Sequence, residues 1–545
     1  MMKGFLNRER FLKIVKNKHL WDVVVIGGGA TGLGIALDSS SRGYKTILLE
    51  QSDFSKSTSS RSTKLVHGGI RYLAQGNIKL VWEALKERGY LLKNAPHLVK
   101  KKKFIIPIFD WKMGIFYWIG LKIYEWLSGS LSFGKSRFLS KNEIVKNIPE
   151  IQCNQLKGGI LYYDGQFDDA RMAINLAQTC VKQGGILLNY FKVKNLIKKK
   201  NKILGVIASD IETKKEYKIC AKIVINATGI FSDSILKMDN TSKNHSFIKP
   251  SQGTHIVLSK SFFSSQDAIV IPKTSDGRVL FCIPWYEHVL VGTTDTFLDK
   301  CVLDPIPLEK EINFILKTFK QYFLIRPNKN DILSAFSGLR PLFVSSDHDM
   351  KNKTKDISRT HKLMVNDSGL ISIIGGKWTT YRKMAEDTID KAIEIGGLNK
   401  KPSLTKNLKI YGSHSFSKKR EKISDYWEKY GEDAKKIKKL IQQHSFLGQS
   451  LFLNHNHDHK SFHSFYDDDC YTEAEVIWMV RNEMARTVED VLARRFRLLF
   501  LNAKKAIDIA PKVASIMAKE MDRDETWEKL QVSNFVKLAM QYFYP

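Results

Sequence analysis

The stretch DVVVIGGGATGLG, residues 22–34, joins a short apolar run to three closely spaced glycines. The apolar residues 22–26 have the length and β-branched content of a buried strand. A helical stretch follows the glycines, and YKTILLE, residues 44–50, has the pattern of a second strand. This order predicts a parallel βαβ unit with a glycine-rich turn after its first strand.

The glycine turn has the spacing of a dinucleotide-binding site. Gly27 permits the tight turn, Gly29 lets the backbone approach a pyrophosphate, and Gly32 allows close packing of helix on strand. The helix N-terminus then offers N–H groups and a partial positive charge to the phosphates. Glu50 lies 21 residues after Gly29, where a carboxylate can accept hydrogen bonds from ribose hydroxyls. The motif does not distinguish FAD from NAD. No second such motif is evident, so electrons are not expected to arrive from a nicotinamide.

The chain has 545 residues and a formal charge of +31, from 87 basic and 56 acidic residues. Its length predicts two or three domains. The basic excess favours an anionic partner, which could be membrane lipid, nucleic acid or a phosphorylated substrate. Lysines spread over solvated faces explain the same charge equally well, so both interpretations stay open.

Strand-like runs recur up to residue 376 and alternate with helical segments, which is typical of an α/β or α+β core. We expect a basic helical extension over residues 1–20, a main region over 21–400 and a helical C-terminal domain over 401–545. No segment is expected to span a bilayer, since charges interrupt even the apolar stretch 104–127. We predict a buried helix within that stretch, with an interfacial helix as the alternative.

Two polar clusters permit a metal site without favouring one. HNHDHKSFH, residues 455–463, groups imidazoles with a carboxylate but lacks a supporting ligand pattern. DGQFDDAR, residues 164–171, holds three carboxylates, and acids at a helix N-terminus are the simpler interpretation. No metal is therefore predicted.

TSSRSTKLVHGGIRYL, residues 58–73, places hydroxyls, glycine backbone and cations near the cofactor turn. With this segment, INATGIFSDS (225–234), SGLRPL (337–342), ISRTH (357–361) and GGKWTTYRKMAEDT (375–388) give the chain its resemblance to FAD-dependent glycerol-3-phosphate dehydrogenases. The resemblance covers nearly the whole chain, including EAEVIWMVRNEMARTVEDVLARR (473–495). It implies FAD and an α/β fold: a Rossmann-like FAD-binding domain of the glutathione-reductase/amino-acid-oxidase type, interleaved with a substrate-binding β-sheet domain and followed by an all-helical C-terminal domain.

The resemblance also implies the reaction, in which glycerol 3-phosphate gives a hydride to FAD and becomes dihydroxyacetone phosphate. This substrate is a small dianion and needs several fixed cations. By resemblance, the substrate-binding residues are Arg71, Tyr72, Arg340, Arg359 and Lys377. His255 is the expected general base, with Arg340 as the alternative participant because a cation stabilises a developing alkoxide.

Cofactor contacts are expected from the glycine turn, from the segment that follows the second strand, and from the GGKWTT motif. Besides Gly27, Gly29, Gly32 and Glu50, they are Thr58, Ser59, Lys64, His67, Gly68, Gly69, Gly376 and Thr379. The helix that begins near Lys377 is expected to direct its positive end at the flavin.

Without a second nucleotide site, a lipid quinone is the expected electron acceptor, and the family implies one. A quinone is reached from the membrane surface. We therefore expect peripheral attachment at the cytoplasmic face of a bacterial inner membrane, with the mitochondrial inner membrane less favoured. A homodimer stays open, and no nucleic acid partner is predicted.

Two other functions remain as alternatives. One is a flavin oxidase of the same fold that acts on an amine or hydroxy acid and releases peroxide. The other is a basic flavoprotein that binds RNA, although no RNA-binding motif is recognisable.

Overall fold

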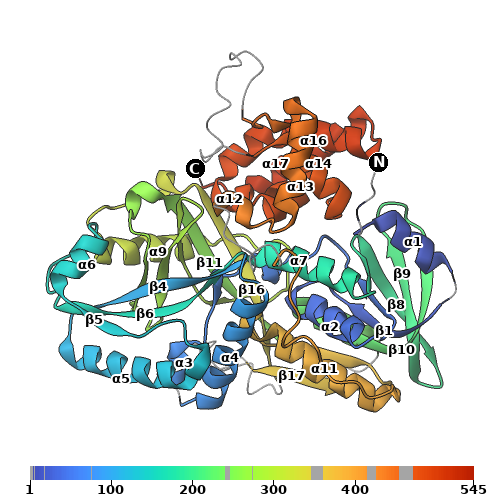
Figure 1. Cartoon of the computed structure of the whole chain (residues 1–545), viewed down its shortest axis with the longest axis horizontal. Helices are drawn as coiled ribbons and strands as arrows, with labels where there is room; N and C mark the ends of the chain where they lie inside the picture. The colour runs from blue at the N-terminus through green and yellow to red at the C-terminus, as the bar shows by residue number, and fades with distance from the viewer. Residues whose placement is uncertain are drawn as a thin grey trace.

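In the computed structural model the βαβ unit expected from residues 22–50 is present. It consists of β1 (Leu20–Ile26), α2 (Ala30–Ser41) and β2 (Thr46–Leu49), and β1 pairs with β2 in parallel. The structure describes residues 4, 6–17, 19–74, 76–239, 246–272, 274–344, 360–413, 425–452 and 471–544. Two sheets lie side by side, and a helical unit covers the region where they meet (Figure 1).

The first sheet has eight strands and is built outward from β1. Its path runs β17-β18-β10-β1-β2-β7, parallel except for β17, and the β8–β9 hairpin extends it from β10. The added strands are β7 (Ile186–Leu188), β8 (Phe191–Lys199), β9 (Lys202–Asp210), β10 (Glu216–Asn226), β17 (His361–Val365) and β18 (Ile371–Gly375). Helix α2 packs between α7 (Asp169–Lys182) and α11 (Tyr381–Gly396), while α1 (Arg8–Lys16) contacts β7 and β10. Residues 23–26 of β1 are almost fully buried, which explains why this part of the strand is a continuous apolar run.

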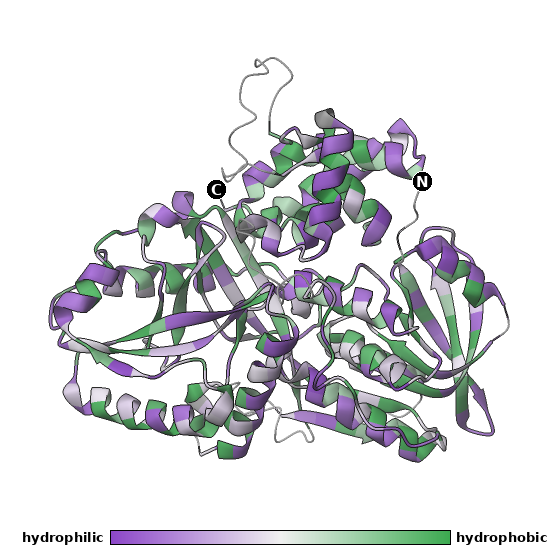
Figure 2. Ribbon diagram, in the orientation of Figure 1, coloured by the Kyte–Doolittle hydropathy of each residue, from purple (hydrophilic) through white to green (hydrophobic). Residues whose placement is uncertain are grey.

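The second sheet has ten strands, most of them antiparallel. They are β3 (Leu65–Val66), β4 (Val99–Ile108), β5 (Arg137–Leu139), β6 (Gly158–Phe167), β11 (Ile248–Ser259), β12 (Ala268–Ile271), β13 (Leu280–Trp285), β14 (His288–Gly292), β15 (Thr296–Phe297) and β16 (Ser334–Phe343). Both faces are buried: Val257 of β11 packs towards the C-terminal helices, and its neighbours Ile256 and Leu258 pack with residues of α6 (Lys141–Asn147) and α9 (Glu309–Tyr322). Hydrophobic residues accordingly run through both sheets (Figure 2).

The C-terminal unit is helical, as expected. It contains α12 (Asp425–Glu428), α13 (Asp433–Gln443), α14 (Glu473–Asn482), a π-helical turn at Asp490–Arg495, α15 (Leu498–Leu501), α16 (Ala503–Met521) and α17 (Glu525–Ala539). Leu499 and Phe500 of α15 belong to the same hydrophobic cluster as Phe336 of β16. The unit therefore shares a core with the second sheet, and the boundary at residue 400 stays a prediction.

The prediction of a buried helix within residues 104–127 is wrong. The stretch divides between β4 and α5 (Trp111–Ser128), and the sheet is flanked there by α3 (Ile70–Ala74) and α4 (Ile78–Asn94). The buried residues of α5 form one narrow stripe, Gly114, Leu121, Tyr124 and Ser128. The helix is apolar on almost every side, so its sequence could not show which stripe would be covered. No helix in the described ranges combines the length and apolarity that crossing a bilayer requires.

A buried ionic cluster joins the C-terminal unit to the segment after β2. Asp53 is fully buried, its carboxylate lies 2.5 Å from Arg494 Nε, and it also accepts hydrogen bonds from Arg495. Burial opposes ionisation of Asp53, but the two guanidinium groups outweigh it and hold the pKa of this carboxyl below its usual value. Nearby, Glu489 accepts a hydrogen bond from Lys56 at 2.7 Å. The segment at residues 53–56 is thus held by side chains more than 400 positions away.

Removing one partner of this cluster should destabilise the whole protein. Asp53→Asn leaves two buried guanidinium groups without their carboxylate, so we expect the free energy of unfolding to fall by about 3–5 kcal/mol. Equilibrium unfolding in denaturant measures this change. Glu525→Gln is the control, because its ion pair with Lys529 is largely exposed and should contribute little. Equal stability of the two variants would contradict the role given to Asp53.

Candidate functional site

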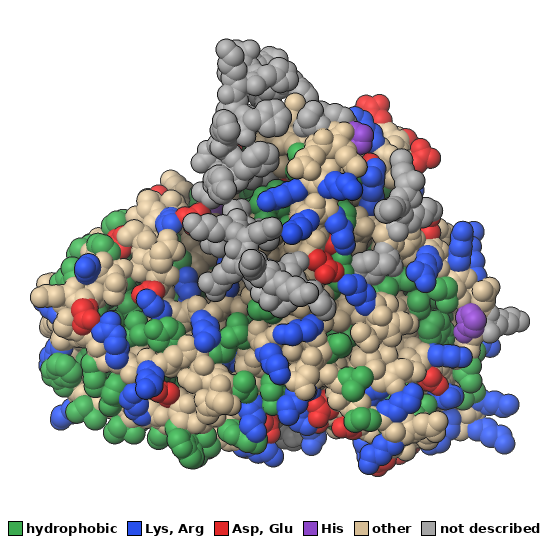
Figure 3. All heavy atoms as spheres, in the orientation of Figure 1, with side chains coloured by type: hydrophobic (Ala, Val, Ile, Leu, Met, Phe, Trp, Pro, Cys, Tyr) green, Lys and Arg blue, Asp and Glu red, His purple; other side chains and the backbone are tan. Residues whose placement is uncertain are grey.

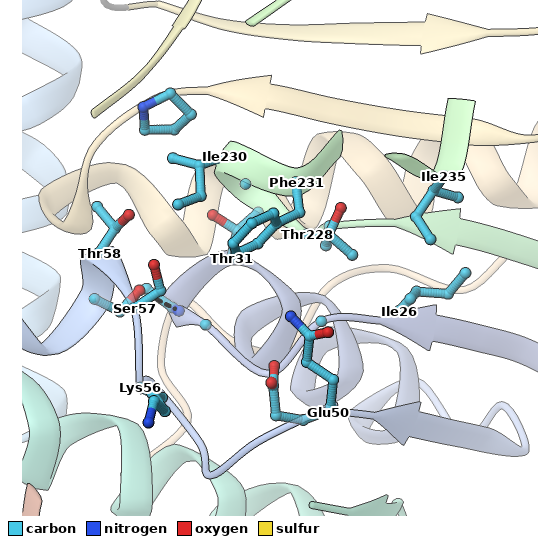
Figure 4. A pocket seen from close by; sticks show the side chains of 18 of the residues that line it. Ile26, Thr31, Glu50, Lys56, Ser57, Thr58, Thr228, Ile230, Phe231 and Ile235 are labelled. Carbon is cyan, nitrogen blue, oxygen red and sulfur yellow. Dashed lines mark hydrogen bonds between the residues drawn. The ribbon is translucent and has the colours of Figure 1, made fainter. Parts of the chain in front are cut away.

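A cavity of about 460 Å³ opens at the carboxyl ends of the parallel strands β1, β2, β10 and β18. This is where open α/β sheets bind their ligands. Figure 4 shows Lys56, Ser57 and Thr58 on one side of it, Thr228, Ile230 and Phe231 on the other, and Glu50 at the end of β2. The walls therefore come from segments far apart in the sequence.

The glycine turn lines the cavity in the way its spacing predicts. Gly27 has φ +107°, a conformation that favours glycine. A Cβ atom on Gly32 would lie 1.8 Å from the carbonyl oxygen of Gly27, so α2 approaches the turn as closely as backbone allows. The Ala30 N–H at the start of α2 donates to Ser59 Oγ at 3.0 Å. Backbone N–H groups at such a helix start are suited to a pyrophosphate.

Glu50 faces the cavity, and its carboxylate also accepts hydrogen bonds from backbone N–H groups. Its Oε2 accepts the Gly28 N–H at 2.6 Å and its Oε1 accepts the Ser52 N–H at 2.8 Å. Burial raises the pKa of Glu50 above its usual value in spite of these two hydrogen bonds. The carboxylate therefore shapes the turn itself, a role that the spacing argument did not anticipate.

Another part of the cavity wall is formed by the segment at residues 57–59 and the residues after β18. Trp378 Nε1–H donates to the Ser59 carbonyl at 2.8 Å, and Thr58 Oγ1 donates to the Leu339 carbonyl at 2.6 Å. Gly376 and Lys377 belong to this part of the wall. A short 3-10 turn at Trp378–Thr380 and then α11 follow Lys377, so the N-terminal end of these helical turns lies beside the cavity.

Two expected substrate residues meet beside this part of the wall. The Lys377 ammonium lies 3.9 Å from the centre of the Tyr72 ring, a cation–π contact. Arg340 lies next to Pro341, which lines the cavity. The Arg340 guanidinium is 3.4 Å from Asp295 and 3.3 Å from both Ser251 Oγ and Thr293 Oγ1. Polar neighbours thus hold Arg340 in a partly exposed position.

His255 lies on β11 beneath the segment that carries Thr63. Its ring is 2% exposed, stacks on Phe336 and has its Nε2 3.0 Å from Thr63 Oγ1. No described residue forms a hydrogen bond with its Nδ1. Burial, with Lys64 and Arg340 nearby, lowers the pKa of His255 well below its usual value. The imidazole is therefore neutral at physiological pH and able to accept a proton.

Other expected site residues lie behind the cavity wall. Lys64 is fully buried and binds Asp169 at 2.6 Å, in a core that also holds Arg497. The Gly68 N–H donates to Tyr124, and the His67 N–H donates to Thr379 Oγ1. These hydrogen bonds hold the segment that contains Gly69. This glycine is not one of the residues that line the cavity.

Three expectations cannot be followed to side chains. Arg71 belongs to α3, but its side chain is not described, and Arg359 and residues 455–463 lie outside the described residues. Within the described part of the chain, no group of three potential metal ligands converges. The carboxylates of DGQFDDAR have structural partners, since Asp168 caps α7 and Asp164 binds Arg88.

The apolar wall of the cavity is what residue-by-residue reasoning missed. Phe191, Ile235 and Met238 line it together with Ile230 and Phe231. Apolar residues carry no local sign of ligand binding, and only the motif INATGIFSDS pointed to this region. A glycine cradle, an apolar wall and Lys377 on the lining together fit a dinucleotide with an aromatic head, as in FAD.

Comparisons with known proteins agree with this geometry. A family model described as FAD dependent oxidoreductase matches residues 22–382, and one described as the C-terminal domain of alpha-glycerophosphate oxidase matches 403–528. The mitochondrial glycerol-3-phosphate dehydrogenase of Mus musculus is 38% identical over 99% of this chain and 75% of its own length. That of Schizosaccharomyces pombe is also 38% identical, over 96% of this chain and 88% of its own.

Solved structures support the fold. The glycerol-3-phosphate dehydrogenase from Bacillus halodurans complexed with FAD has a TM-score of 0.75 and 28% identity, over 99% of this chain and 98% of its own. The L-alpha-glycerophosphate oxidase from Mycoplasma pneumoniae has a TM-score of 0.56 and 17% identity, over 72% of this chain and 99% of its own. The second likeness concerns the fold alone.

Closing the glycine turn should remove the cofactor. In Gly32→Ala the added methyl group would meet the Gly27 carbonyl, so we expect the purified variant to lose most of its bound flavin. The ratio of flavin to protein absorbance measures this. Gly120→Ala is the matched control, because a Cβ there has no atom within 4 Å. A full flavin content in Gly32→Ala would contradict the assignment of the turn.

Proposed function

Because this chain belongs to the family of FAD-dependent glycerol-3-phosphate dehydrogenases, we propose how its own residues oxidise glycerol 3-phosphate and where the electrons go. FAD, when bound, supplies the hydride acceptor. The observation that carries the proposal is the position of Lys377, on the lining of the cavity beside Trp378, whose indole donates to the Ser59 carbonyl. The substrate would enter beside it with its phosphate towards the cations.

Lys377 and Arg340 are the proposed anchors of the substrate phosphate. Lys377 lines the cavity with its ammonium over the Tyr72 ring, and Arg340 directly precedes the lining residue Pro341. Arg340 suits a phosphate because its planar fork can donate two hydrogen bonds to two oxygens. Arg71 and Arg359 complete the set by family resemblance.

His255 is the proposed base, and Thr63 is the proposed link between it and the substrate. His255 is almost fully buried, whereas Thr63 is half-buried and bonded to its Nε2. We propose that the substrate C2 hydroxyl gives its proton to Thr63 Oγ1 while Thr63 gives its own proton to Nε2. The C2–H bond breaks with its electron pair, and the ketone forms. Only a neutral imidazole accepts a proton. Because the pKa of His255 is lowered well below its usual value, the neutral imidazole is retained at pH values below 6.5.

Anaerobic bleaching of the flavin tests substrate, anchor and base together. Glycerol 3-phosphate should bleach the yellow protein and glycerol should not. Arg340→Ala should raise the half-saturating concentration about 10- to 100-fold, since it removes charge-assisted hydrogen bonds. His255→Asn and Thr63→Val should instead lower the limiting rate about 10²- to 10⁴-fold.

Two controls accompany this experiment. Arg326→Ala removes an exposed arginine away from the cavity lining, and Thr63→Ser retains the hydroxyl. Both should behave as the wild type. Unchanged rates in His255→Asn would rule out this base. Equal bleaching by glycerol would rule out recognition of the phosphate. A stoichiometric yield of peroxide in air would favour an oxidase.

We propose that the electrons pass to a lipid quinone and that α5 is the surface that meets the membrane. Its exposed apolar face, here called the α5 face, lies at the edge of the molecule where hydrophobic side chains gather in Figure 3. It comprises Trp111, Met113, Ile115, Phe116, Ile119, Ile123 and Trp126. Trp126 is 78% exposed. An apolar patch with this many large side chains marks an interaction site.

Charge favours a lipid surface over a protein as the occupant of the α5 face. Residues 110–141 hold five basic and two acidic residues, 5 − 2 = +3, and Lys112, Lys122 and Arg137 are exposed. Tryptophan with flanking cations is typical of helices that lie in the headgroup region. The dehydrogenases of Mus musculus and Schizosaccharomyces pombe named above are mitochondrial, and the bacterial location stays a prediction.

Vesicle binding tests the α5 face. Combined Ile115→Glu and Phe116→Glu should abolish sedimentation with vesicles that contain anionic lipid, because both side chains are 55% exposed and would place charge in the bilayer. Leu530→Glu is the matched control, at 54% exposure on α17. Equal sedimentation of the double variant and the wild type would show that another surface meets the lipid.

A further inference from the structure

Tyr124 stands on the narrow buried stripe of α5, on the side away from the α5 face. Its hydroxyl accepts the Gly68 N–H at 2.7 Å and donates to Asp164 Oδ2 at 2.6 Å. Asp164 is held in turn by Arg88 Nη1 at 2.8 Å. All three side chains are almost fully buried, so the Gly68 amide ends a chain of hydrogen bonds that starts on α4 and passes through β6 and α5.

Several contacts make this chain rigid. Arg88 also donates to Ser128 of α5 at 3.2 Å, and its guanidinium lies 4.1 Å from the centre of the Phe133 ring. Burial and the adjacent Asp164 carboxylate raise the pKa of Tyr124 well above its usual value, so the phenol stays protonated. A protonated hydroxyl can donate to Asp164 and accept from Gly68 at the same time. The position of the Gly68 amide is thereby determined.

Gly68 begins the turn that places Tyr72 under Lys377. Gly69 has φ +78°, and the Tyr72 N–H donates to the Gly69 carbonyl at 2.9 Å. A Cβ on Gly69 would lie 2.6 Å from the Tyr72 ring and 3.7 Å from Lys377 Nζ. A shift of Gly68 would therefore move the aromatic surface on which the Lys377 ammonium rests.

We propose that Tyr124 is a positioning residue for the phosphate anchor of the substrate site. It does not touch substrate or FAD. Its hydroxyl fixes Gly68, Gly68 and Gly69 fix Tyr72, and Tyr72 supports Lys377. This inference rests on the proposed function, since it takes Lys377 to bind the substrate phosphate. It predicts that Tyr124 governs substrate affinity, while the proton transfer at His255 proceeds without it.

Tyr124→Phe tests the proposal, because it removes the hydroxyl and retains the packed ring. The Gly68 N–H then lacks its buried acceptor. In anaerobic bleaching of the holoenzyme we expect the half-saturating glycerol 3-phosphate concentration to rise about 10-fold. The limiting rate and the flavin content should stay at the wild-type level. Tyr117→Phe, on the same helix, is the matched control and should leave the half-saturating concentration, the limiting rate and the flavin content unchanged.

A double-mutant cycle with Lys377→Met separates positioning from a general structural effect. If Tyr124 acts through Lys377, its loss should add little to the loss of Lys377, whereas independent effects multiply. Wild-type affinity in Tyr124→Phe, fully multiplicative losses in the double variant, or loss of flavin from Tyr124→Phe would each overturn the proposal. Failure of glycerol 3-phosphate to bleach the wild type would instead contradict the proposed function, so the two failures are distinguishable.

Discussion

The buried pairing of Asp53 with Arg494 and Arg495 is the constraint on which the cofactor side of the molecule depends. The segment after β2 has no regular structure from residue 50 to 57, yet its residues 55–59 line the cavity. A chain of this kind acquires a single conformation only when outside contacts fix it. Three such contacts come from the π-helical turn and the residue before it: Arg494, Arg495 and Glu489. The C-terminal unit therefore supports the cofactor site, although none of its described residues lies on the lining.

A second set of buried hydrogen bonds fixes the conformation of the chain segment on the substrate side. Arg88, Asp164 and Tyr124 come from three different elements and form a chain of hydrogen bonds that ends at the Gly68 amide. Buried polar groups that have their hydrogen-bond partners, as Asp164 and the Tyr124 hydroxyl do here, fix local geometry. Tyr124 stands on the helix whose opposite side is the α5 face. One helix thus contacts the surroundings on one side and the substrate segment on the other.

Charge is used in two distinct ways in this basic protein. Some cations are buried and structural, such as Lys64 on Asp169 and Arg497 on the same carboxylate. Others lie beside the cavity or on the surface, such as Lys377 and Lys112. Burial lowers the pKa of Lys64 to about 7 against the attraction of Asp169, which is the behaviour of a group enclosed for packing and hydrogen bonding. Net charge alone could not distinguish these uses.

The sequence by itself determined the βαβ unit, the glycine turn and, through family motifs, the reaction. These features are local: strand, turn and helix patterns span a few residues each, and spacing fixes their geometry. Only the tertiary structure decided that Lys64 is buried on Asp169, that Glu50 binds the turn backbone and that α5 exposes most of its apolar surface. It also paired Asp53 with arginines 441 and 442 positions away. The reason is physical: burial and ion pairing depend on which distant segments pack together, and no local pattern records that.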